Sequence, residues 1–194
     1  MKKETAILFI AIAFLVGFIT GAVVAILKGG KGTEKMTTVQ KPQMVQSPSV
    51  LDPMEVVSKI QDQKEIVRKD PKNPSAWAEL GNLYFDSEQP KEAIEAYNRY
   101  LAIQPDNPDV RTDMGIMYRR LGDFDRAIEE FKKASQGDPK HLNSRYNMGI
   151  VLLHDKADIK GTIKVWEEYL KVDPNSERAG RIKAQLENLK RMAK

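Results

Sequence analysis

Residues 77–84 read Trp-Ala-Glu-Leu-Gly-Asn-Leu-Tyr, and their pattern returns twice at an interval of 34 residues. The Leu80-Gly81 pair in this stretch is matched by Met114-Gly115 and by Met148-Gly149. Self-similarity at a fixed interval indicates an array of structural units that bury their apolar faces only by stacking on one another. The interval also joins other positions: Trp77, Arg111 and Arg145; Tyr84, Tyr118 and Leu152; Ala93 and Ala127; Pro71, Pro105 and Pro139.

The spacing within each unit indicates a helical hairpin. Gly81 lets two helices cross closely, and aromatic side chains fill the spaces so created. Trp77 and Trp166 stand at repeat positions, so we expect both in the core. The third unit runs one residue long, and the extra residue falls between His154 and Lys160, where it reshapes a turn and spares the core.

The motif of the first unit resembles that of the tetratricopeptide repeat family: Trp77-x2-Leu80-Gly81-x2-Tyr84, then Ala93, Tyr97 and Pro105. The second unit keeps most of the motif, including Ala127 and Phe131. The resemblance implies an all-α solenoid of three helical hairpins, at residues 74–107, 108–141 and 142–175.

Two further helices are expected to cover the open ends of the array. Asp52-Pro53-Met54-Glu55 has the cap residue, first-turn proline and acid that are typical of a helix start, so a capping helix is predicted at 51–70. At the other end, Ser176 caps a predicted helix at 176–193 whose Lys and Arg residues face water. Solenoids need such solvated caps.

The N-terminal part carries a predicted membrane anchor. After a short tail at 1–5, residues 6–27 are 22 uncharged, mostly apolar residues with Lys on both sides, enough for a helix to span a hydrocarbon layer of roughly 30 Å. A cleaved signal peptide is the alternative, but its apolar core is shorter, about 7 to 15 residues. We therefore expect a single-pass protein of a bacterial inner membrane, with its C-terminal domain in the periplasm.

Two more features of this part bear on partners and reach. Small residues recur every four positions in the apolar run, which predicts a face suited to dimerisation unless they reflect only the usual composition of membrane helices. These residues are Ala13, Gly17, Gly21 and Ala25. Residues 28–50 contain mainly Gly, Lys, Thr, Gln, Ser and Pro without periodicity, which predicts a disordered linker.

Charge and composition argue against several functions. Residues 1–50 hold six Lys and two Glu, which accounts for the net charge of +4, while residues 51–194 hold 25 basic and 25 acidic residues. A neutral folded part beside a basic, membrane-flanking tail argues against nucleic-acid binding. Cys is absent, no phosphate-binding Gly loop or nucleophile elbow is found, and His141 and His154 lack partners at metal-ligand spacing. We expect no enzyme activity, no cofactor and no metal.

The resemblance also implies where a partner binds. In tetratricopeptide repeats the first helices line a concave groove, and a position-by-position transfer gives these partner-binding residues: Ala78, Asn82, Phe85, Thr112, Asp113, Ile116, Arg119, Arg120, Asn143, Tyr146, Asn147, Ile150 and Leu153. The wider lining adds Ser75, Asp86, Asp109 and His154. A chaperone clamp on a C-terminal carboxylate is not expected, because Ala78, Asp113 and Asn143 stand where it needs other chemistry. The groove suits an amphipathic helix or an extended tail, with Arg119 pairing with a carboxylate.

Three segments resemble a narrower group, the periplasmic tetratricopeptide domains of bacterial cytochrome c maturation factors. They are Met117–Gly122, Asn147–Leu153 and Trp166–Leu170. Domains of that group hold the C-terminal helix of an apocytochrome while haem is attached, so the resemblance implies a holding role with apocytochrome c or haem-lyase subunits as partners. The alternative is a scaffold or assembly factor of another cell-envelope complex, for secretion, pilus or cell-wall assembly, with a different client.

Overall fold

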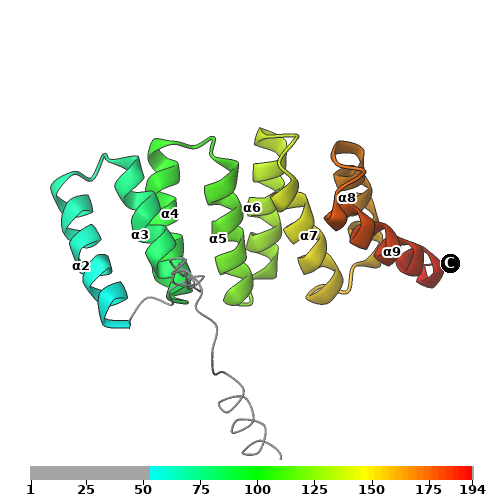
Figure 1. The fold of residues 1–194 in the computed structure, drawn as a ribbon, viewed down its shortest axis with the longest axis horizontal. Helices are drawn as coiled ribbons and strands as arrows, with labels where there is room; N and C mark the ends of the chain where they lie inside the picture. Colours follow the sequence, from blue (N-terminus) through cyan, green and yellow to red (C-terminus); the bar gives the residue numbers. More distant parts are fainter. Residues whose placement is uncertain (1–52, 194) are drawn as a thin grey trace, which may run out of the picture. The chain divides into compact units, whose positions relative to one another are not determined.

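The computed structural model describes residues 53–193, and this part of the chain is a row of α-helices without strands (Figure 1). The helices are α2 (Pro53–Lys69), α3 (Pro74–Asp86), α4 (Pro90–Ile103), α5 (Pro108–Arg120), α6 (Phe124–Gly137), α7 (Leu142–His154), α8 (Ile159–Val172) and α9 (Glu177–Met192). Each first helix packs mainly on its successor, as α3 does on α4, and each second helix packs on the next hairpin. The all-α solenoid predicted from the 34-residue interval is confirmed.

The predicted membrane helix at 6–27, with its small-residue face, and the predicted linker at 28–50 lie outside the described residues. Within 53–193, none of the helices combines the length and apolar character that crossing a membrane requires.

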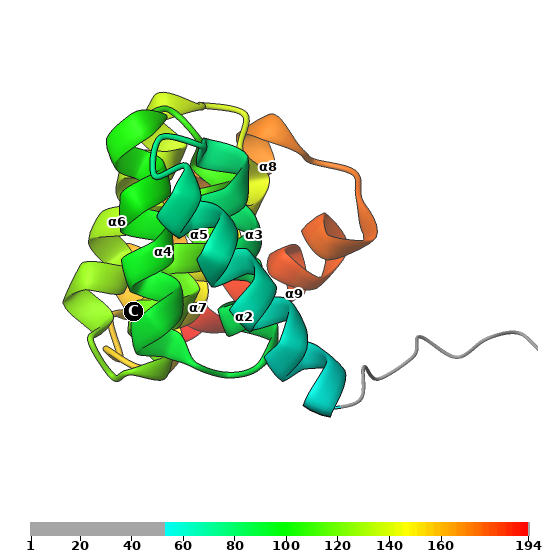
Figure 2. The ribbon, with the colours of Figure 1, turned by 90° about the vertical axis from the view of Figure 1, so that its left-hand side faces the viewer.

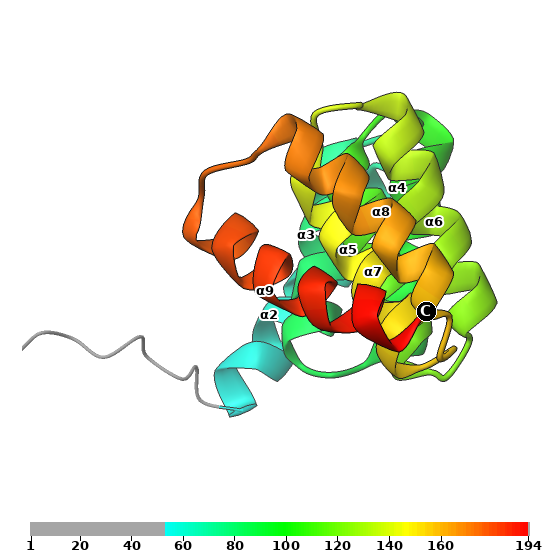
Figure 3. The same ribbon diagram turned by 90° about the vertical axis from the view of Figure 1, so that its right-hand side faces the viewer.

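The helices form layers that set up one exposed face. Helices α3, α5 and α7 lie side by side, with α4 and α6 on one side of them and α9 on the other (Figures 2 and 3). Contacts between α3 and α5 and between α5 and α7 agree with this arrangement. The first helices therefore share a surface that the second helices do not cover, and the predicted groove positions belong to these helices.

A glycine facing an aromatic ring permits the close crossing in every hairpin. A Cβ atom added to any of the three glycines would come within 3.0 Å of ring atoms of the paired side chain, and all three rings are fully buried. Any larger residue would therefore push the two helices apart. The pairs are Gly81 with Tyr97, Gly115 with Phe131, and Gly149 with Trp166.

The third hairpin has a longer turn, as predicted. Three residues separate the helices of the first two hairpins, whereas four separate α7 from α8. Each turn contains one residue with positive φ: Glu88 at 56°, Gly122 at 78° and Ala157 at 53°. Only glycine adopts this conformation without strain, so the first and third turns hold a less suitable residue than the second.

Both ends of the array are covered by a helix with a buried stripe. On α2, Ile60 and Val67 are buried, and Gln63 donates a hydrogen bond from Nε2 to the carbonyl oxygen of Ala76 at 2.9 Å. At the other end, Ser176 caps α9 by accepting the backbone N–H of Ala179. The buried residues of α9 are Ala179, Ile182, Leu186 and Leu189.

The two tryptophans differ in burial. Trp166 is fully buried, as predicted. Trp77 is only partly buried, which corrects the expectation that both lie in the core. Its indole N–H donates to the carbonyl oxygen of Pro71 at 2.9 Å, so this side chain closes the start of its own repeat as well as packing on it.

Candidate functional site

The predicted groove positions lie on α3, α5 and α7, and most of them remain accessible. Exposed positions are Asn82, Arg120 and Asn143. Partly buried positions are Ala78, Phe85, Asp113, Ile116, Arg119, Tyr146, Asn147, Ile150 and Leu153. Half-buried apolar side chains between exposed polar ones are what a peptide-binding surface requires.

Thr112 is a correction to the predicted groove. Its side chain is buried, with 3% of the residue exposed. Its hydroxyl donates to the carbonyl oxygen of Pro108, one turn earlier on α5, at 2.8 Å. Thr112 therefore faces the interior of the array, and a bound partner does not reach it.

The first helices begin in a common way that the 34-residue interval reveals. Asn73 and Asn107 cap α3 and α5, each accepting a backbone N–H three residues ahead. His141 stands at the third such position, and its Nδ1 accepts the N–H of Ser144 at 3.3 Å. The proton then lies on Nε2, which donates to Asp109 Oδ1 at 3.0 Å. His141 is thus a helix cap that also joins the second and third repeats, a role the sequence analysis did not assign.

The two groove arginines are engaged within the array. Arg119 donates from Nε to Asp155 Oδ2 at 2.5 Å, and the Arg119 side chain is 36% exposed against 19% for Asp155. Arg120 donates to the carbonyl oxygen of Phe85 at 3.1 Å, and its guanidinium lies 4.8 Å from the centroid of the Phe85 ring. A partner carboxylate would therefore have to compete with Asp155 for Arg119, which weakens the predicted role of Arg119 as a carboxylate anchor.

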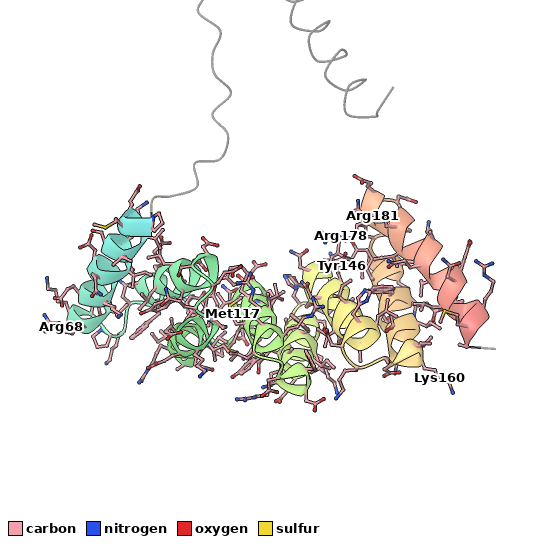
Figure 4. All side chains as sticks on the ribbon, turned by 90° about the horizontal axis from the view of Figure 1, so that it is seen from below. Arg68, Met117, Tyr146, Lys160, Arg178 and Arg181 are labelled. Atoms are coloured by element: carbon pink, nitrogen blue, oxygen red, sulfur yellow. The ribbon has the colours of Figure 1, made fainter. Side chains whose placement is uncertain are left out.

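The C-terminal helix reaches onto the end of the groove. Arg178 of α9 donates to Asn143 Oδ1 at 2.9 Å, and its guanidinium lies 4.8 Å from the centroid of the Tyr146 ring. Figure 4 shows Arg178 beside Tyr146. The sequence analysis placed the basic residues of this helix in water, so this contact was missed, and the surface of α7 is less open than that of α3 and α5.

A carboxyl group without a counter-ion lies in the middle of the groove. Burial raises the pKa of Asp113 to about 6, and the negative charges of Asp109 and Asp86 raise it further against the opposing effect of His141. Within residues 53–193, Asp113 forms no hydrogen bond or ion pair. Burial with like-charged neighbours disfavours the ionised form, so this group destabilises the native state at neutral pH.

We expect Asp113→Asn to raise the free energy of unfolding at pH 7.5 by about 1 kcal/mol, a value reduced from the full linkage energy because the carboxyl keeps access to solvent. The native pKa lies above the unfolded one, so the wild type loses stability as pH rises from about 4 to about 6 and stays level above it. Urea unfolding of both proteins from pH 3.5 to 8 checks this. The gain should vanish below pH 4, and Asp106→Asn, an exposed control, should show none. A gain that is independent of pH would contradict the assignment.

Comparison with known proteins agrees with this architecture. A family model described as tetratricopeptide repeat matches residues 80–145. No curated protein matches the sequence. The match and the fold support the tetratricopeptide repeat family for this helical array, which makes it a protein–protein interaction module.

Solved structures share the fold at low sequence identity. The crystal structure of MamA superposes with a TM-score of 0.64 and 19% identity, covering 71% of this chain and 80% of that one. The first tetratricopeptide domain of Spaghetti (RPAP3), bound to the HSP90 peptide SRMEEVD, has a TM-score of 0.54 and 22% identity over 62% of this chain and 94% of that one. The Sgt2 domain from Aspergillus fumigatus has a TM-score of 0.54 and 26% identity over 62% and 78%.

Proposed function

We propose that this chain holds a helix or a C-terminal tail of a client protein on the face formed by α3, α5 and α7. The observation that carries the proposal is the composition of that face. Phe85, Ile116 and Ile150 are half-buried apolar side chains, and Asn82 is an exposed amide between them. Apolar side chains supply contact area for an amphipathic segment, and amides supply hydrogen bonds that fix its position. The Spaghetti domain, which has the same fold and a bound peptide, supports this use of the face.

The client we propose is an apocytochrome c, held during cytochrome c maturation on the periplasmic side of a bacterial inner membrane. The resemblance of residues 117–122, 147–153 and 166–170 to the domains of maturation factors motivates this choice. The apolar run at 6–27 would tether the module to that membrane. A scaffold of another cell-envelope complex would use the same face with a different client.

Site-specific cross-linking tests the proposal. Because the chain contains no Cys, a single introduced cysteine carries a benzophenone maleimide at one place only. Asn82→Cys and Asn147→Cys place the probe on the proposed face, whereas Asn98→Cys on α4 and Glu129→Cys on α6 are exposed controls on second helices. The full-length protein is irradiated in cell-envelope extracts, and the adducts are identified by mass spectrometry.

The outcomes separate the two levels of the proposal. Apocytochromes or haem-ligation proteins attached from Asn82 and Asn147, and absent from the controls, are the expected result. A different envelope client attached from the same two positions would leave the interaction module in place and refute the maturation role. Equal labelling from Asn98 and Glu129 would refute binding on this face.

A further inference from the structure

The part of the groove between α3 and α5 is acidic. Asp86 lies in the last turn of α3, and Asp109 and Asp113 lie one turn apart on α5, which contacts α3. Both neighbouring carboxylates act on Asp113 strongly enough to raise its pKa beyond the effect of burial. The three negative charges therefore share one small area of the surface.

No cation of the described residues neutralises this area. Asp86 and Asp113 form no ion pair or hydrogen bond with any residue in 53–193. The nearby Arg119 and Arg120 are bound to other groups, as described above. Asp109 has His141 as its partner, but its side chain is still 77% exposed. The area thus presents carboxylate oxygens whose hydrogen-bonding capacity is unused by the protein itself.

Apolar surface flanks these carboxylates. Ile116 lies one turn beyond Asp113 on α5, and Phe85 lies next to Asp86 on α3; both are half-buried and pack on the core. At the far end of the groove, Arg178 of α9 covers part of α7. The surface left open to a partner is therefore the α3–α5 part, where acidic and apolar groups alternate.

We propose that this surface selects a client segment in which a Lys or Arg side chain stands between apolar residues, with its cation among Asp86, Asp109 and Asp113. The inference rests on the proposed function, because it names the chemistry of the segment held on the same face. A bound ammonium or guanidinium supplies the missing counter-charge through charge-assisted hydrogen bonds, while its apolar neighbours cover Phe85 and Ile116. An acidic tail such as SRMEEVD meets like charge here and is disfavoured.

A phage-displayed library of random dodecapeptides, panned on the full-length protein, tests this selectivity. We expect the enriched peptides to carry Lys or Arg between apolar residues. Asp113→Asn should weaken their binding about tenfold in fluorescence anisotropy, the loss of one charge-assisted contact. Asp106→Asn removes an exposed carboxylate in the α4–α5 loop and should leave the affinity unchanged within about twofold.

Cross-linking locates the peptides and distinguishes the two possible failures. Peptides that attach from Asn82→Cys but show no preference for Lys or Arg, or that bind Asp113→Asn as tightly as wild type, overturn the inference and leave the proposed function standing. Enriched peptides that attach equally from Asn98→Cys, or a library that yields no binder, overturn both. Weakening by Asp106→Asn equal to that by Asp113→Asn means that only the overall charge matters, which also overturns the inference.

Discussion

Gly149→Ala is expected to lower the free energy of unfolding by about 3 kcal/mol, as overpacking of a rigid core does. The added Cβ would lie within 3.0 Å of three atoms of the Trp166 indole. Trp166 is fully buried, and its Nε1 lies 3.4 Å from the carbonyl oxygen of Tyr146, so the ring has little freedom to move aside. The strain should exceed the gain of up to about 1 kcal/mol that Ala brings over Gly within a helix.

Gly180→Ala is the matched control, because it adds the same methyl group inside α9, where a Cβ meets nothing within 4 Å. It should stabilise the protein by about 0.5 to 1 kcal/mol. Urea denaturation followed by circular dichroism at 222 nm measures both variants. If Gly149→Ala unfolds at the wild-type midpoint, the crossing of α7 and α8 is looser than the structure indicates.

The repeat interval accounts for how much of the fold was predictable. Positions such as Gly115 and Ala127 are dictated within one hairpin, by contacts between residues close in sequence, so a periodic sequence reveals them. The extra residue of the third repeat was predictable for the same reason, and it moves the aromatic partner of Gly149 to Trp166, one place later than in the other repeats.

The candidate site was less predictable, because its contacts join residues of different repeats. The pairing of Arg119 with Asp155 and the stacking of Arg178 on Tyr146 depend on the angle between successive hairpins, which no interval encodes. Thr112 was misplaced because a position assigned to the groove from the family pattern turns inward here. A signal for His141 did exist, since it follows Asn73 and Asn107 on the same 34-residue ruler.

Arg111 shows how a repeat position keeps its role while changing its chemistry. Trp77 and Arg111 are equivalent, and each donates an N–H to the carbonyl oxygen of the proline at its repeat boundary: Trp77 to Pro71 at 2.9 Å and Arg111 to Pro105 at 3.0 Å. Arg111 also forms an ion pair of 2.9 Å with Glu130, whose side chain is 9% exposed. The guanidinium thus joins α5 to α6 within the second repeat.

We expect Arg111→Met to lower the free energy of unfolding by about 2 to 3 kcal/mol, because removing one member of a buried ion pair leaves the other charge without its partner. The loss falls at the low end for such pairs, since Lys133 still contacts Glu130 at 2.8 Å. Adding Glu130→Gln to Arg111→Met should recover about 1 kcal/mol, because the stranded charge is then gone. Urea unfolding of the two single variants and the double variant gives this coupling energy.

Arg145→Met is the informative comparison, since Arg145 occupies the equivalent position in the third repeat. Its guanidinium donates to the carbonyl oxygens of His141 at 3.1 Å and Ser135 at 3.5 Å and forms no ion pair within the described part of the chain. Its loss should cost about 1 kcal/mol, the net value of ordinary hydrogen bonds. Equal losses in Arg145→Met and Arg111→Met would mean that closing the repeat boundary, and not the ion pair with Glu130, is what the arginine contributes.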